Sequence, residues 1–308
     1  MSVIGEEPRA ATCGVTLSCI GGLPDLLAAG TTLAPAVAQL VPRNGSDLVD
    51  LFGPLAEAYR TLPGFMSSLT ELLIPYIAED RGVRLSPGVH PATGLGGCEA
   101  AVIASLRLLV PDVVRWTDGA LPPLLLNVTG GRPHVRPEFV AAAWSGAVCL
   151  RWRRHPAAAL SLGAPPGLWG VVLPRDVHVL PRIPVPEPMS AMRATAAAGR
   201  LAVLTEALRR GEPPLLEAAG EDPLFLPAVA PHWPGAYPAV RAARDAGAWL
   251  AWFPAGGPAL AVLAPPERLA HAMDAICTVW SAHGVAFDVL RDRAADSAGH
   301  STAIMEEG

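Results

Sequence analysis

The sequence contains no lysine: all 23 basic residues in its 308 positions are arginine. Without lysine, the chain cannot form a Schiff base, hold pyridoxal phosphate covalently or supply a P-loop lysine. Charged residues make up only 17% and the formal net charge is −5. An acidic chain with few aromatic residues and no basic run is a poor nucleic-acid binder, so no nucleic-acid partner is expected.

Long hydrophobic runs are also missing, although hydrophobic residues make up 51% of the chain. No stretch of about 18 apolar residues is free of charge and proline, so we expect no membrane span. Residues 1–9 include Glu6 and Glu7 and lack the basic and apolar segments of a secretory signal. A cytoplasmic location is therefore the expectation.

Cysteines are few and scattered, and no C-x-x-C pair occurs among the five. Such a set predicts neither a disulfide framework nor a zinc site, and we expect no metal site. Cys98 differs from the others because it lies at the predicted start of a helix, where a thiol pKa is generally lowered.

The chain does contain a regular order of helix and strand patterns. Apolar spacing predicts helices over residues 47–59, 67–78, 99–110, 137–144, 191–210, 215–219, 239–247 and 266–283. Strands are expected over 11–20, 149–152, 169–173, 177–180, 248–253, 259–263 and 285–290. The order at the C-terminal end is typical of a split β-α-β sandwich. Residues 292–308 are small and polar, and we expect them to be disordered.

The most informative segment is a glycine-rich turn at residues 91–101 that leads into an apolar helix. Such a turn offers free backbone N–H groups and the positive end of the helix dipole to an anion. Here the first helical turn already carries the carboxylate of Glu99. Gly97 and Cys98, the two positions before it, have no hydroxyl to hold a metal ion. The segment looks like a phosphate loop without its chemistry.

This turn resembles the phosphate loop of the GHMP superfamily, the small-molecule kinases named for galactokinase, homoserine kinase, mevalonate kinase and phosphomevalonate kinase. Homoserine kinase is the best match within the superfamily. The family form P-x-x-x-G-L-G-S-S-A-A fits with one residue fewer before Gly94, and Gly96 is kept. Gly97 and Cys98 replace the paired serines and Glu99 the next small residue, so the loop is degenerate.

A second segment resembles the family's G-H-P-D-N-V helix start and aligns without a gap with residues 135–140. Arg136 replaces the histidine, Glu138 the aspartate and Phe139 the asparagine. His134 stands where the family places its metal-binding glutamate. The resemblance implies that this edge faces the small substrate.

Further segments resemble the family more loosely. Asp25 falls on the aspartate that ends the family's N-terminal motif. Residues 221–227 resemble D-x-L-H-Q-P, with Asp222 kept and Phe225 in place of the histidine. Residues 253–259 resemble the closing S-G-x-G-P-T turn.

The resemblance implies an α/β (α+β) fold of two domains, GHMP-kinase-like in arrangement. A ribosomal-S5-like N-terminal domain is expected over residues 1–165 and a ferredoxin-like C-terminal domain over 166–291. The resemblance also implies a small-molecule substrate and a homodimer.

The expected function follows from what the loop has lost. In the family a loop serine and an acidic residue hold Mg²⁺, and neither is kept here. Glu99 adds negative charge near the triphosphate position, where each like-charge pair at about 5 Å and an effective dielectric of 20 costs on the order of 3 kcal/mol. We therefore expect no cofactor and a repurposed, metal-free enzyme of specialised metabolism, which cyclises, isomerises or eliminates by acid–base catalysis.

Two alternatives stay open. One is an ATP- and Mg-dependent kinase that phosphorylates a hydroxyl of a homoserine-like substrate. The other is a non-catalytic binding subunit. The residues expected to be catalytic are Glu99, Asp222, Glu138 and Arg136; those expected to bind substrate are Asp25, His134, Phe139, Phe225 and Arg193. Most of them have a structural alternative: Glu99 as a helix-start residue that points to solvent, Arg136 and Glu138 as an ordinary helix start, Asp222 as a cap, Asp25 in a turn, His134 as a structural residue and Arg193 as a solvated helix position.

Overall fold

The computed structural model describes residues 10–14, 16–18, 27–43, 45, 47–110, 135–151, 159–176, 190–222, 225–254, 257–292 and 304–307. Asp25, His134 and the strand expected at 177–180 lie outside the described residues. Within them, no helix is long and apolar enough to cross a membrane.

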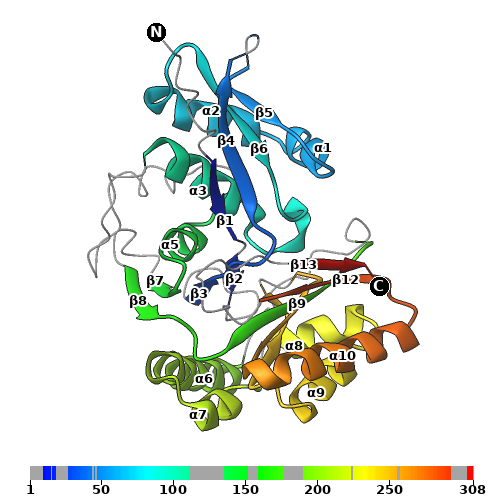
Figure 1. Ribbon diagram of the computed structural model, residues 1–308. Helices are drawn as coiled ribbons and strands as arrows, with labels where there is room; N and C mark the ends of the chain where they lie inside the picture. The colour runs from blue at the N-terminus through cyan, green and yellow to red at the C-terminus, as the bar shows by residue number, and fades with distance from the viewer. Residues whose placement is uncertain are drawn as a thin grey trace.

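The N-terminal part holds two four-stranded sheets (Figure 1). The first has the order β1 (Ala10–Cys13), β4 (Ala36–Pro42), β6 (Arg81–Ser86), β5 (Val49–Leu51). The second has the order β2 (Thr16–Ser18), β3 (Leu27–Gly30), β7 (Val148–Arg151), β8 (Ala159–Gly163). All pairs are antiparallel except β5–β6, which is parallel.

Helix α3 (Gly97–Leu109) is the centre of this part, and nearly all of its 13 residues are buried. A helix that is apolar on all sides must be covered on all sides. Strands β1 and β4 and helix α5 (Pro137–Ser145) pack against it. The starts of α3 and α5 are thereby held inside the protein.

The C-terminal part is built on a five-stranded antiparallel sheet (Figure 1). Its order is β10 (Leu250–Trp252), β11 (Leu260–Ala264), β9 (Leu168–Pro174), β12 (Phe287–Arg291), β13 (Ile304–Glu307). Side chains alternate between the faces, as in any strand. Val172 packs in a cluster with α9 (Ala236–Asp245) and α10 (Pro266–Ala282). Val171 packs in a cluster with α6 (Ala191–Arg210) and α7 (Pro213–Ala218).

The mixed α/β class predicted from the sequence is confirmed, and several helices fall where the pattern placed them. Helix α6 has the predicted bounds, because Ser190 accepts a hydrogen bond from the Arg193 N–H at 3.3 Å and Gly211 ends the helix at φ +68°. The domain division at residue 165 stays a prediction.

The helix predicted over residues 47–59 is wrong in its first half. Residues 49–51 form β5, whose burial alternates, and only Ala56–Arg60 is helical, as α1. Gly53, at φ +87°, and Pro54 separate the two. The helix predicted at 67–78 is α2 (Phe65–Leu73), followed by the 3-10 turn Ile74–Tyr76. Tertiary pairing with β6 decides the first case, and local spacing cannot show it.

The disordered tail predicted from residue 292 is also wrong at two places. Ile304–Glu307 forms β13 along β12. Asp292 accepts hydrogen bonds from the Thr32 hydroxyl at 2.7 Å and the Trp169 N–H at 3.1 Å. Burial raises the pKa of Asp292. This carboxyl ties the loop after β3 to the C-terminal sheet, a contact between distant residues that small polar composition does not reveal.

Candidate functional site

The glycine-rich turn before α3 has a fixed backbone. Gly94 and Gly96 lie in the left-handed region, at φ +76° and +64°, where glycine is favoured. The buried Thr93 hydroxyl donates to the His90 carbonyl at 2.8 Å and accepts from the Leu95 N–H at 3.3 Å. The turn expected from the sequence is therefore present, with a rigid entry into the helix.

Tyr59 covers the first helical residue, Gly97. The Tyr59 hydroxyl donates to the Val89 carbonyl at 2.9 Å. A Cβ atom on Gly97 would lie 2.3 Å from that hydroxyl and 2.9 Å from a Val89 methyl group. A serine, as in the family pattern, cannot stand here unless Tyr59 moves. Sequence reasoning missed Tyr59, because nothing in its local pattern points to the loop.

Glu99 and Arg136 form a buried ion pair that joins the starts of α3 and α5. Glu99 is 1% exposed, and its Oε1 accepts from the Arg136 backbone N–H at 2.7 Å and from Nε–H at 3.1 Å. Its Oε2 is buried and has no hydrogen-bond partner among the described residues. The alternative in which Glu99 points to solvent is therefore wrong. The carboxylate is turned inward and compensates an unsatisfied N–H at the start of α5.

The Arg136 side chain lies flat on Phe139. The guanidinium carbon is 3.8 Å from the centroid of the Phe139 ring, a cation–π geometry. Phe139 is fully buried, whereas the Arg136 side chain is 31% exposed. Phe139, predicted to bind substrate, thus supports Arg136 from below. The Nη groups of Arg136 have no partner in the part of the chain that the structure describes.

The pKa of the Cys98 thiol is raised, whereas its place at a helix start predicted a lowered pKa. Burial, followed by the charge of Glu99, raises its pKa well above the ordinary value, while Arg136 lowers it by less. The general effect of the helix dipole is therefore outweighed by desolvation. Cys98 is a neutral thiol, and a neutral thiol is a poor ligand for a hard cation such as Mg²⁺.

The closing turn of the C-terminal sheet reaches this loop. A Cβ atom on Gly257 would lie 2.5 Å from the Thr93 carbonyl oxygen, so the two backbones are in close contact. The candidate loop therefore lies where the N-terminal and C-terminal parts meet, a contact that the sequence did not predict.

The other predicted site residues do not all gather here. Asp222 lines a separate pocket of about 700 Å³, next to Glu217, Tyr237 and Arg244, and neither Glu99 nor Arg136 lines it. Arg193 is exposed in the first turn of α6, as its structural alternative predicted. Glu138 lies in the first turn of α5, and Phe225 begins α8 (Phe225–Val229).

The described residues bring no set of metal ligands together at this site, and His134 lies outside them. Within the described ranges, no group of three or more His, Cys, Asp or Glu residues could hold a metal ion. At the loop, the residues that would face a nucleotide's metal are a glycine, a neutral thiol and a carboxylate already paired with Arg136. These residues do not fit Mg-ATP in the way the family loop does.

Comparison with known proteins shows a likeness to homoserine kinases. No model of a protein family matches the chain. It is 25% identical over 218 residues to the homoserine kinase of Synechococcus, a match to 66% of this chain and 65% of that protein, just under two thirds of the relative's length. The solved structure of homoserine kinase from Cytophaga hutchinsonii covers 99% of both chains with a TM-score of 0.75 at 18% identity. Mevalonate kinase from Staphylococcus aureus covers 92% of this chain and 98% of its own, with a TM-score of 0.64 at 12% identity. The predicted two-domain GHMP-kinase-like fold is confirmed.

Proposed function

For this homoserine kinase-like protein with the fold of the GHMP kinases, we propose that transfer of phosphate from Mg-ATP has been lost. In its place the chain performs metal-free acid–base catalysis on a small molecule. The observation that carries the proposal is the buried Glu99 carboxylate, which has one oxygen held by Arg136 and the other without a partner among the described residues.

The loss of phosphoryl transfer follows from charge at the loop. Phosphoryl transfer needs cations and positioned donors, because negative charge spreads over the transferred oxygens. Here the first turn of α3 supplies a carboxylate and no hydroxyl. A like charge at about 5 Å and an effective dielectric of 20 opposes each phosphate charge by on the order of 3 kcal/mol, a repulsion that the paired Arg136 reduces.

The acid–base role rests on the two unequal oxygens of Glu99. Oε1 accepts two hydrogen bonds from Arg136, which fixes the carboxyl plane. Oε2 has no partner among the described residues and is buried, so the proposal requires the substrate to displace the groups that cover it before Oε2 takes a proton and returns it. Cyclisation, isomerisation and elimination each move a proton from one substrate atom to another position, and none needs a nucleotide.

A second candidate function is supported by the backbone of the loop. The left-handed conformations of Gly94 and Gly96 and the contact of Gly257 with Thr93 keep the turn in place. A kinase that phosphorylates a hydroxyl of a homoserine-like substrate would use this turn, with ATP and Mg²⁺ as cosubstrates. The curated relative from Synechococcus is named for this activity.

Calorimetric titration with Mg-ATP separates the two candidates. We expect no binding at micromolar nucleotide concentrations, because Glu99 repels the phosphates. The Glu99→Gln variant, which keeps an oxygen for Arg136 but removes the charge, is the matched comparison and should bind ATP more tightly than the native chain. Micromolar affinity of the native chain, with phosphate transfer to L-homoserine, would establish the kinase instead.

Solvent exchange tests the acid–base role directly. In D₂O the native chain should exchange a carbon-bound hydrogen of a small hydroxylated acid, followed by NMR across a panel that includes L-homoserine. Glu99→Gln should slow this exchange by at least about 100-fold, since general acid–base catalysis contributes that much. Equal exchange by both proteins would refute the role of Glu99, and no exchange together with no ATP binding would favour the binding subunit.

The proposed setting is a cytoplasmic homodimer in specialised metabolism. Two exposed apolar side chains are candidates for the dimer contact: Met192 in the first turn of α6 is 80% exposed, and Leu160 on the edge strand β8 is 47% exposed. A contiguous exposed apolar patch is typical of an interface, and the dimer would cover these side chains. Light scattering after size exclusion, on the native chain and on Met192→Glu, would show whether this surface holds two copies together.

A further inference from the structure

We infer that Arg136 is the anchor for a carboxylate group of the substrate, with Glu99 as the residue that positions it. The inference rests on the proposed function, because it places the substrate at the edge where α3 and α5 begin. It adds to the proposed function the residue of this chain that would hold the substrate and the substrate group that this residue would bind.

The guanidinium of Arg136 is held on two sides and free on the third. Its Nε–H donates to Glu99 at 3.1 Å, and its flat face lies 3.8 Å from the Phe139 ring centroid. The two Nη groups have no partner among the described residues, and the side chain is 31% exposed. A guanidinium edge of this kind offers parallel N–H donors with the spacing of a carboxylate's two oxygens.

The pre-set orientation makes the anchor effective. A free arginine loses rotamer freedom when it binds a ligand, whereas Arg136 has already lost it to Glu99 and Phe139. Its backbone N–H is also taken by Glu99. The start of α5 therefore does not offer this N–H to an anion, and the side chain is the remaining donor.

The local charge favours a monoanion over a phosphate. Arg136 and Glu99 together are neutral, and the unpartnered Oε2 leaves negative charge close to the guanidinium. Removing a dianion from water costs about four times as much as removing a monoanion of similar size, whereas its net interaction with the neutral Glu99–Arg136 pair only about doubles. A single carboxylate can therefore pair with Arg136 at a place where inorganic phosphate is disfavoured.

The arginine at position 136 also favours a carboxylate ligand. The family pattern has histidine here, which offers at most two N–H donors and is only partly charged at neutral pH. Arginine is always charged and offers five donors in a fixed plane. Arg136 and the Glu99 carboxylate that orients it form one unit across 37 positions of sequence.

NMR of the full chain labelled with ¹⁵N-arginine tests this anchor without an activity assay. The Nε–H resonance of Arg136 is assigned by its loss in Arg136→Lys. We expect acetate and L-homoserine to shift it saturably, acetamide to leave it unchanged, and inorganic phosphate to bind at least about tenfold more weakly than acetate. Arg241→Lys, at an exposed arginine of α9, is the control and should leave the response unchanged.

Variants of Glu99 and Phe139 test whether these residues position the Arg136 guanidinium for a ligand or only stabilise the fold. Glu99→Gln keeps the acceptor but removes the charge, so the preference for acetate over phosphate should fall about tenfold or more. Phe139→Leu keeps the site apolar but removes the stacking face, so acetate should bind several-fold more weakly while the Nε–H resonance persists. Arg136→Lys lacks this resonance, so its acetate affinity is measured by calorimetric titration beside the native chain, and it should be about tenfold weaker.

The inference is overturned if neither carboxylate gives a saturable shift, if phosphate binds more tightly than acetate, or if Arg136→Lys binds acetate as well as the native chain. Its failure is distinguishable from that of the proposed function. Micromolar Mg-ATP binding with an intact acetate response would refute the loss of phosphoryl transfer and leave the anchor standing. If acetate gives no response but deuterium exchange still depends on Glu99, the carboxylate anchor is refuted and the acid–base function stands.

Discussion

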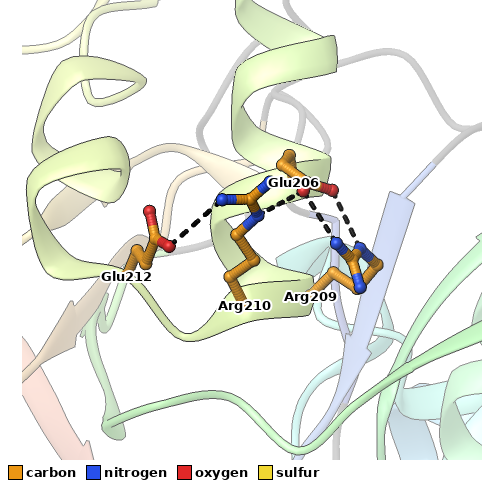
Figure 2. Close-up of polar contacts among 4 residues, drawn as sticks. All are labelled: Glu206, Arg209, Arg210 and Glu212. Carbon is orange, nitrogen blue, oxygen red and sulfur yellow. Dashed lines mark hydrogen bonds and ion pairs between the residues drawn. The ribbon is translucent and has the colours of Figure 1, made fainter.

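Two clusters of glutamate and arginine show how the same chemistry differs between surface and interior. At the end of α6, Glu206 pairs with Arg209 and Arg210, and Arg210 also reaches Glu212 (Figure 2). These side chains are 38–55% exposed. At the start of α3, Glu99 is 1% exposed and its only charged partner among the described residues is Arg136.

The surface cluster is local and the buried pair is not. Glu206 reaches residues three and four positions away, as any helix allows. The Glu99–Arg136 pair joins residues 37 positions apart and holds two helix starts together. Water solvates the charges of an exposed pair, whereas a buried charge is stabilised mainly by its partner. Burial, more than the number of contacts, therefore decides what each pair contributes.

The largest expected effect comes from removing one partner of the buried pair. Arg136→Ala leaves the Glu99 carboxylate buried without a cation, and the free energy of unfolding should fall by about 3–5 kcal/mol. Urea unfolding measures it. Arg209→Ala, the matched change in the exposed cluster, should change stability little.

A double variant sharpens this result. Replacing both members, as in Glu99→Ala with Arg136→Ala, removes the stranded charge, so it should cost less than Arg136→Ala alone. Equal losses for Arg136→Ala and Arg209→Ala would abolish the contrast between interior and surface.

The next largest effect is expected at Gly97, two positions before Glu99. Gly97→Ser places a Cβ 2.3 Å from the Tyr59 hydroxyl. Such overpacking should lower the free energy of unfolding by about 1–3 kcal/mol, measured in urea. Tyr59→Phe, which removes the obstructing hydroxyl, should partly relieve the loss in the double variant.

Gly199→Ser is the control for Gly97→Ser. A Cβ at Gly199 meets no atom within 4 Å, and the residue lies inside the helix α6. This change should be neutral or slightly stabilising, because serine is more favourable than glycine inside a helix by roughly 0.3–0.5 kcal/mol. Additive losses in the Gly97→Ser and Tyr59→Phe pair would show that the hydroxyl does not restrict the loop.

The smallest effect belongs to the exposed cluster and depends on pH. Hydrogen bonds from Arg209 and Arg210 lower the pKa of Glu206 to about 2. Because the folded pKa lies below the ordinary value of about 4.3, the stabilisation is present above that pH and is lost as pH falls toward 2. Comparing unfolding of the native chain and Glu206→Gln across this window should show a small difference that salt reduces. A difference that grows toward low pH would contradict it.

Much of the fold could be predicted because its signals are local. Helix α6 begins after Ser190 and ends before Gly211, and both signals are readable in the sequence. Strand β5 could not be predicted, since its pairing with β6 comes from residues more than 30 positions away. The same holds for Asp292, whose polar character suggested a tail and whose partner Thr32 lies 260 positions earlier.

The site was predicted in part for the same reason. The loop glycines, Glu99 and Arg136 all stood out as departures from a family pattern. That Glu99 and Arg136 bind each other, and that Phe139 supports the arginine, did not follow from that pattern. Asp222 was placed with them by resemblance, but the structure gives it a different pocket.

The sequence by itself determined which groups are available at the loop: glycines that allow the turn, a glycine and a thiol where the family has hydroxyls, a carboxylate directly after them, and no lysine anywhere. Only the tertiary structure decided what those groups do. Packing buries Glu99, and burial makes its charge depend on Arg136 and turns Cys98 into a neutral thiol. The physical reason is that residue types fix charges and donors, while their energies depend on the solvent and partners that folding leaves around them.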